Sequence, residues 1–194
     1  MALTTDELLD GLPEIFRYSE ALHRLSSRQL RRLIDDGNIT ALSRGLYRKS
    51  DWLGDEDLIG VAAKAPHATL CLRSALVHHE LIDDIPAEID IAIPRGSWTP
   101  AVAAPVRWRH FAPETFDIGR GELAIEGGRS IGLYSAERSI CDAFRMRHLE
   151  GADLGNEALK RWLRRGGQPS ELLGMAQSFP RAAAAMRRTL EILL

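Results

Sequence analysis

The fold of the amino-terminal part of this chain is decided by the stretch Leu25-Ser-Ser-Arg-Gln-Leu-Arg-Arg-Leu-Ile-Asp-Asp-Gly37. Ser26 and Gln29 have the spacing of a capping box, in which each side chain satisfies a free amide at a helix start. An apolar face at helical spacing follows, made of Leu30, Leu33 and Ile34. Gly37 offers the left-handed conformation that ends helices. The stretch therefore predicts a helix over Ser27–Asp36.

Two more helices and a hairpin are predicted around this helix. Thr4 and Glu7 repeat the capping-box spacing and indicate a helix over residues 5–12. Apolar residues at spacings of three and four indicate a second helix over residues 14–25, with the stripe Ile15, Tyr18, Leu22 and Leu25. Behind the third helix, residues 39–42 and 46–48 are short strand-like runs around the turn Ser43-Arg44-Gly45. This order is typical of a winged helix-turn-helix, which we expect over residues 1–51.

The charge distribution supports that interpretation, although the 194 residues carry a net charge of only −2. Residues 17–49 hold eight bases against three acids, whereas residues 50–105 hold three bases against nine acids. Residues 151–194 are basic again, with seven bases against four acids. Nearly all of the bases are arginines, which favours bidentate phosphate or guanine contacts but also reflects the composition of GC-rich genomes.

The predicted third helix would be the DNA reader. Three of its arginines lie away from the apolar face, where they can meet phosphates and base edges. The helix start also points backbone amides outward, which suits a phosphate, and the hairpin would add charge beside the groove. The predicted DNA-binding residues are Ser27, Arg28, Gln29, Arg31, Arg32, Arg44, Arg48 and Lys49. The alternative is a solvated face in which Arg31 and Arg32 pair with Asp35 and Asp36.

Residues 52–194 are predicted to form a mixed α/β domain that ends in helices, so the whole chain is expected to be α+β. Alternating polar and apolar residues indicate strands over residues 88–94 and 106–111, and Gly127-Gly128 indicates a hairpin turn. Ser135 is placed to cap a helix that runs to about residue 146. Helical patterns fill residues 156–165 and 170–194, with an interruption at Pro180.

Several of these segments together resemble a known family, the AbiEi-type antitoxins. The resemblance rests on the stretch Leu25–Gly37, on Leu42-Ser-Arg-Gly-Leu-Tyr-Arg48, and on three later blocks in family order. Those blocks are Leu72-Arg-Ser-Ala-Leu-Val-His-His-Glu-Leu81, Ile91-Ala-Ile-Pro-Arg-Gly96 and Gly132-Leu-Tyr-Ser-Ala-Glu-Arg-Ser-Ile-Cys-Asp142. The resemblance implies a type IV toxin–antitoxin regulator, not an enzyme. Its winged helix would repress its own operon at inverted repeats in double-stranded DNA, and its larger domain would neutralise a nucleotidyltransferase-like toxin.

A basic helical face near the carboxyl end is the candidate for the toxin contact. It is formed by Arg161, Arg164 and Arg165, with Lys160 and Trp162 beside them. A solvated amphipathic helix would have the same composition. The alternative function is a stand-alone transcription regulator whose second domain binds a ligand or dimerises.

Other side chains could in principle support metal or catalytic chemistry. Cys71, His78, His79 and Glu80 are possible ligands, but no second cluster at zinc spacing follows them. Glu88 and Asp90 alternate on one strand and could hold a cation, as in a nucleotidyltransferase, although no glycine-rich phosphate loop accompanies them. We expect no metal, no cofactor and no catalytic residue.

The expected location is the cytoplasm. The two cysteines, Cys71 and Cys141, lie far apart among apolar residues, as reduced core thiols do. No apolar run reaches the roughly 18–20 residues of a membrane span. Met1–Leu12 carries three acids where a signal peptide would be basic and then apolar.

Overall fold

The computed structural model describes residues 4–126 and 128–193. The chain divides into two compact units. The first unit comprises Met1–Ala63 and Ala124–Ser130, and the second comprises Lys64–Leu123 and Ile131–Leu194. The predicted domain boundary at residues 51–52 lies before helix α4 (Glu56–Lys64), most of which belongs to the first unit.

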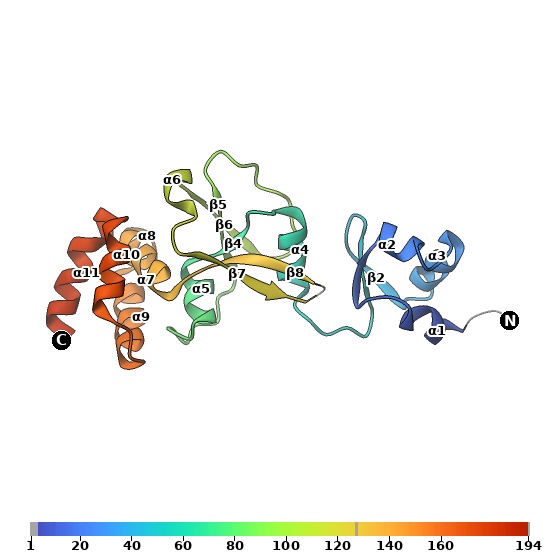
Figure 1. Ribbon diagram of the computed structural model, residues 1–194, viewed down its shortest axis with the longest axis horizontal. Coiled ribbons are helices and arrows are strands. Elements are labelled where there is room, and N and C mark those ends of the chain that lie inside the picture. The colour runs from blue at the N-terminus through green and yellow to red at the C-terminus, as the bar shows by residue number, and fades with distance from the viewer. Residues whose placement is uncertain (1–3, 127, 194) are drawn as a thin grey trace. The chain divides into compact units, whose positions relative to one another are not determined.

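The first unit combines short helices with a three-stranded antiparallel sheet (Figure 1). The strand order is β1-β3-β2, so the hairpin strand β3 is central. Besides α4, its elements are α1 (Thr5–Asp10), β1 (Ile15–Arg17), α2 (Tyr18–Leu22), α3 (Ser27–Asp35), β2 (Ile39–Ser43) and β3 (Leu46–Lys49).

The predicted helix over residues 14–25 is wrong at its start, because Ile15–Arg17 form strand β1 and the helix covers only Tyr18–Leu22. Phe16 lies opposite Tyr47 of β3, and the Lys49 amide donates to the Glu14 carbonyl at 2.9 Å. A new helix then starts at Tyr18, because the Glu20 carboxylate accepts from the Arg17 amide at 2.6 Å. The apolar spacing of three and four did not reveal this pairing, which depends on a strand thirty residues later.

Local signals predicted the other elements of the first unit correctly. The capping boxes Thr4/Glu7 and Ser26/Gln29 both form. Gly37 ends α3 with φ +75°, and Gly45 turns the hairpin with φ +77°. These turns need a residue that tolerates positive φ. The core beneath α3 is apolar and includes Leu8, Phe16, Leu30, Leu33 and Ile39.

The second unit contains a five-stranded mixed sheet of order β6-β5-β4-β8-β7. Strand β4 is antiparallel to β5 and parallel to β8, and β5 is parallel to β6. The strands are β4 (Thr69–Leu70), β5 (Ile89–Pro94), β6 (Val106–Phe111), β7 (Arg120–Ile125) and β8 (Arg129–Tyr134). Of the predicted Gly127-Gly128 turn, Gly128 has φ +65°, whereas Gly127 lies outside the described residues.

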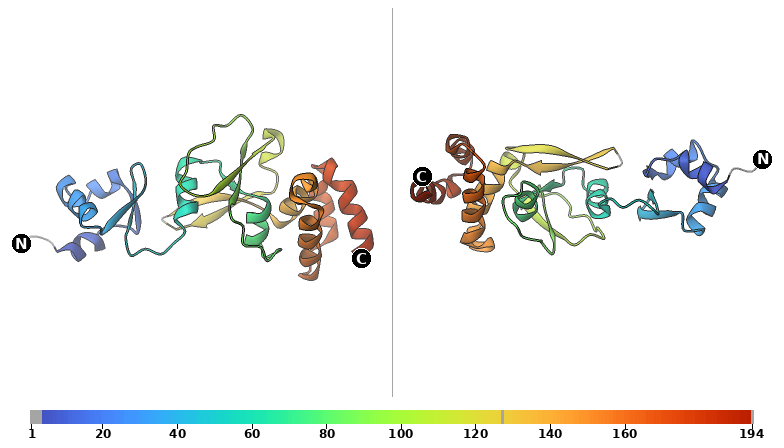
Figure 2. Two further views of the ribbon diagram at one scale, coloured as in Figure 1. Left: turned by 180° about the vertical axis from the view of Figure 1, so that it is seen from behind. Right: turned by 90° about the horizontal axis from the view of Figure 1, so that it is seen from below.

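Helices follow the sheet and form the largest core. Figure 1 shows α7 to α11 gathered at the carboxyl end, and Figure 2 shows the same group from two further sides. Helix α7 contacts α5, α9, α10 and α11, and the Ser135 side chain caps it as predicted. The helices of this unit are α5 (Leu72–His78), α6 (Pro113–Phe116), α7 (Ala136–Arg145), α8 (Arg147–Glu150), α9 (Ala152–Arg164), α10 (Pro169–Gln177) and α11 (Pro180–Leu193). The chain is therefore α+β, as expected.

Candidate nucleic-acid interface

Helix α3 has one packed face and one charged face. Leu30 and Leu33 are buried in the core of the first unit, which fixes the rotation of the helix about its axis. Arg28 and Arg31 point to the opposite side and are exposed. Because residues three apart are neighbours on a helix, these two guanidinium groups lie on the same side of α3. Among the described residues neither of them has an acidic partner.

Arg32 is the third predicted reader on this helix, and it pairs with Asp36. The distance from Nε to Oδ2 is 3.4 Å, and both side chains are at least half exposed. An exposed pair of this kind contributes only about 0–1 kcal/mol, so a phosphate can replace the carboxylate. The predicted alternative of a fully paired arginine face is therefore realised at Arg32 alone.

The two polar residues at the start of α3 have different roles. Ser27 is exposed in the first turn. The Gln29 side-chain oxygen accepts from the Ser26 amide and from the Ser26 hydroxyl, each at 2.8 Å. Gln29 is therefore held by the capping box, with only its amide NH2 group left for an outside partner.

The hairpin leaves one of its three predicted bases exposed and holds the other two within the unit. Arg44 is exposed in the turn between β2 and β3. Arg48 pairs with Glu56 at 2.6 Å and donates to the carbonyls of Lys49 and Ser50 at 2.9 Å. Lys49 pairs with Glu14 at 3.1 Å. The Arg48 and Lys49 side chains are only 15% and 14% exposed, so they stabilise the unit instead of extending from it.

Arg17 is a basic residue near the hairpin turn that the sequence did not assign to the interface. It ends strand β1 and lies opposite Leu46. The next amide, that of Tyr18, donates to the Gly45 carbonyl at 3.0 Å, so Arg17 is close to the turn that carries Arg44. Its side chain is exposed. The predicted helix over residues 14–25 concealed this placement, because it separated Arg17 from the hairpin.

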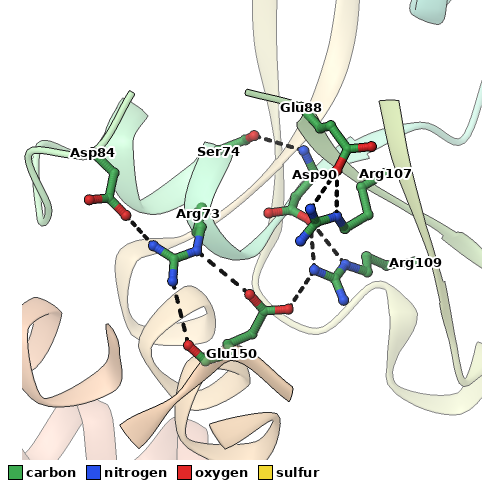
Figure 3. A network of polar contacts seen from close by, with 8 residues as sticks. All are labelled: Arg73, Ser74, Asp84, Glu88, Asp90, Arg107, Arg109 and Glu150. Carbon is green, nitrogen blue, oxygen red and sulfur yellow. Dashed lines mark hydrogen bonds and ion pairs between the residues drawn. The ribbon is translucent and has the colours of Figure 1, made fainter. Parts of the chain in front are cut away.

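The carboxylates suggested for metal chemistry belong to an arginine network in the second unit (Figure 3). Arg109 bridges Asp90 at 2.9 Å and Glu150 at 2.5 Å, and Arg107 pairs with Glu88. Burial raises the pKa of Asp90, and Arg109 partly opposes that shift. Over the described ranges, no group of three or more His, Cys, Asp or Glu side chains is placed to hold a metal ion.

The other possible ligands, Cys71 and the segment His78-His79-Glu80, likewise make contacts of their own within the second unit. Cys71 is fully buried, and burial raises the pKa of its thiol. One ring nitrogen of His79 lies 2.7 Å from the Tyr134 carbonyl oxygen. Glu80, next in the chain, pairs with Arg165 of the segment after α9.

The predicted toxin-binding arginines are partly occupied within the second unit. Arg161 donates to the Asp83 carboxylate at 2.6 Å, and this hydrogen bond holds the pKa of Asp83 below its usual value. Arg165 pairs with Glu80 and donates to the His79 carbonyl at 2.8 Å. Arg164 is exposed. In the described part of the chain only Arg164, of the three, lacks an acidic partner.

Comparisons with known proteins add no relative: no protein-family model matches the chain, and no curated protein matches it. Within the described residues, no helix is both long and apolar enough to cross a lipid bilayer.

Proposed function

We propose that the protein is a DNA-binding antitoxin of a type IV toxin–antitoxin system, in which the first unit acts as a winged helix-turn-helix and represses its own operon. One observation carries the DNA-binding part. Helix α3 is fixed to its core by Leu30 and Leu33, and it presents Arg28 and Arg31, which have no acidic partner among the described residues. Arginines held in buried ion pairs could not bind phosphates. Because Arg28 and Arg31 are exposed, their guanidinium groups are available to phosphates.

The dimensions of the unit suit a major groove. An α-helix with its side chains is about 10–12 Å across, and the major groove of B-DNA is about 12 Å wide, so α3 can enter it. With α3 in the groove, Arg31 and Arg28 would reach bases or flanking phosphates. Arg44 at the hairpin turn, with Arg17 nearby, would contact the adjacent backbone, which is the usual role of a wing.

The toxin-neutralising part rests on the sequence resemblance and on the exposed Arg164 of α9. The protein would act in the cytoplasm, where the two buried cysteines, which are free thiols, would remain reduced. The alternative function is a stand-alone regulator without a toxin. It is favoured by the ion pairs of Arg161 and Arg165, which reduce the charge available to a partner.

Fluorescence anisotropy on double-stranded DNA from the region upstream of the gene tests the DNA-binding part. The wild-type protein should prefer this DNA over a scrambled duplex, and its affinity should fall steeply with salt. Arg28→Ala/Arg31→Ala should lower the slope of log K against log salt by about 2, because each neutralised phosphate adds about 0.9. Arg187→Ala removes an exposed arginine of α11 and should leave the slope unchanged.

Equal affinity for both duplexes would refute sequence-specific regulation. A salt slope that is unchanged in Arg28→Ala/Arg31→Ala would refute the role of α3.

For the antitoxin part, the partner to test is a nucleotidyltransferase encoded by a neighbouring reading frame. Arg164→Glu should weaken the capture of this nucleotidyltransferase in a pull-down, because it reverses a charge at the proposed contact. The substitution leaves the ion pairs of Arg161 with Asp83 and of Arg165 with Glu80 intact, so the test is specific to Arg164. Undiminished capture by Arg164→Glu would remove this face from the toxin contact, and no capture by the wild type would favour the stand-alone regulator.

A further inference from the structure

The second unit carries a basic cleft that the proposed DNA reader does not use. Two hollows, of about 380 Å³ and about 400 Å³, share four lining residues, among them Arg95, Arg145 and Arg181. They are therefore adjoining parts of one groove. Arg95 follows β5, Arg145 ends α7 and Arg181 lies in the first turn of α11, so three separate elements converge on it.

The lining of this cleft is positively charged, although two of its four arginines, Arg109 and Arg145, pair with buried carboxylates. No carboxylate of the described residues lines either hollow. Arg95 and Arg181 are exposed, and within residues 4–126 and 128–193 their side chains have no ion pair or hydrogen bond. A concave surface with charge of one sign concentrates ions of the opposite sign. The cleft therefore favours an anion.

Arg145 is already held in place for such an anion. Its guanidinium pairs with the buried Asp142 at 2.8 Å. It also lies over the rings of Phe111 and Phe179, at 4.8 Å and 5.4 Å from their centroids. A charge fixed in this way loses little conformational freedom when a ligand binds.

Helix α11 contributes a further positive element at the same place. Its 14 residues begin at Pro180, and Pro180 and Arg181 both line the second hollow. Pro180 has no amide hydrogen, and the amides of Ala182 and Ala183 donate to the Phe179 carbonyl at 2.9 and 3.3 Å, so this helix start contributes mainly the positive end of its dipole. The guanidinium groups provide the donors that a phosphate group requires.

The other end of the cleft combines apolar side chains with the polar side chains of Arg109, His110 and His148. Trp108, Met146 and Leu149 line the first hollow, and Leu149 is 64% exposed. Each hollow also lies within the range of about 300–1,000 Å³ that is typical of small-molecule sites. A duplex would lie across the rim of such a hollow, whereas a compact ligand with a flat apolar body would fill it.

We propose that this cleft binds a small phosphate-bearing ligand with a planar apolar body, the chemistry of a nucleoside phosphate. Arg95, Arg145 and Arg181 hold the phosphate, and Trp108 contacts the planar body. The site lies entirely within the second unit and goes beyond DNA binding and toxin neutralisation. It gives the regulator a place for a soluble effector.

Isothermal titration of the full-length protein, without DNA, tests this site. The probes are AMP, GMP, the two nucleosides without phosphate, and pyrophosphate. A nucleoside monophosphate should bind at least about tenfold more tightly than its nucleoside, because hydrogen bonds to the charged phosphate are lost in the nucleoside. Trp108→Leu should weaken the binding of AMP and GMP and leave pyrophosphate unaffected.

Arg95→Gln and Arg181→Gln should each weaken AMP and GMP about tenfold or more. The matched control is Arg187→Gln, an exposed arginine of the same helix α11 that lines neither hollow, and it should change nothing. The side chains of Arg95, Arg181 and Arg187 have no ion-pair or hydrogen-bond partner in the described part of the fold. Thermal unfolding should therefore confirm that the three single variants are folded.

Three results would overturn the proposal. The first is the absence of AMP and GMP binding at millimolar concentration. The second is binding that persists in Arg95→Gln/Arg181→Gln. The third is binding of a short single-stranded oligonucleotide, lost in Arg181→Gln, without binding of AMP or GMP, which would identify the cleft as a nucleic-acid path. Arg28→Ala/Arg31→Ala, titrated in parallel, should bind AMP and GMP like the wild type, so this test is independent of the proposed DNA reader.

Discussion

Asp142→Asn should strongly destabilise the second unit, because it removes the charge that neutralises a buried arginine. Arg138 and Asp142 are both fully buried in α7, and Nε of Arg138 donates to Oδ2 of Asp142 at 2.9 Å. The Arg138 guanidinium lies over the rings of Tyr134 and Phe179, at 4.1 Å and 4.4 Å from their centroids. Water therefore cannot replace the lost carboxylate.

The size of the effect follows from this burial. Breaking a buried ion pair on one side costs about 3–5 kcal/mol, because a desolvated charge remains. For a chain of this length, each kcal/mol shifts the melting temperature by about 2–4 °C, which gives a decrease of about 6–20 °C. Arg138 also donates to the carbonyls of Thr115 and Ile118, so replacing both ion-pair partners by apolar residues should not restore stability.

Thermal and urea unfolding, followed by far-ultraviolet circular dichroism, measure this loss. The matched control is Glu157→Gln, which removes an exposed carboxylate from another i,i+4 arginine pair, that with Arg161. The control should change the free energy of unfolding by less than about 1 kcal/mol. An Asp142→Asn protein as stable as the control would refute the reasoning, since it would mean that the Arg138 charge is solvated.

Three further predictions concern other contacts. The pKa of Asp83, measured by NMR, should lie below 3.8 and return toward that value in Arg161→Gln, because the arginine stabilises the ionised carboxylate. The stabilisation of the fold by this ion pair is present above pH 3.8 and is lost as the pH falls through the lowered pKa of Asp83. An Asp83 pKa that is unchanged in Arg161→Gln would refute the contact. Burial raises the pKa of the Cys141 thiol to about 12, so a thiol reagent should modify it only in denaturant, and rapid reaction of the native protein would contradict this. Gly119→Ala should cost at least about 2 kcal/mol in urea unfolding, because its φ is +69° and a Cβ atom would lie 2.8 Å from Cβ of Arg138; wild-type stability would show that the turn relaxes.

Much of the fold could be predicted from local signals. The capping box Ser26/Gln29 and the positive-φ residue Gly37 define α3 through contacts within a few residues of each other. Ser135 and Pro180 likewise mark the starts of α7 and α11. The prediction failed for residues 15–17, whose strand depends on hydrogen bonds to β3. Apolar periodicity in so short a segment does not distinguish helix from strand.

The sequence predicted the residues of the candidate DNA-binding site less accurately than it predicted the fold. Charge and helix order indicated Arg28, Arg31 and Arg44, and all three are exposed in the structure. The same signals indicated Arg48 and Lys49, which instead pair with Glu56 and Glu14. A count of bases cannot make this distinction, because it does not show which acids the fold brings near them.

The sequence by itself determined the α+β composition, the capped helix α3 and its charged face, because capping, periodicity and turn residues act over a few positions along the chain. Only the tertiary structure decided which charges are free. It paired Arg161 with Asp83 across 78 positions and brought Arg95, Arg145 and Arg181 to one cleft from distant parts of the chain. Such encounters depend on how the elements pack, and packing is a property of the whole unit.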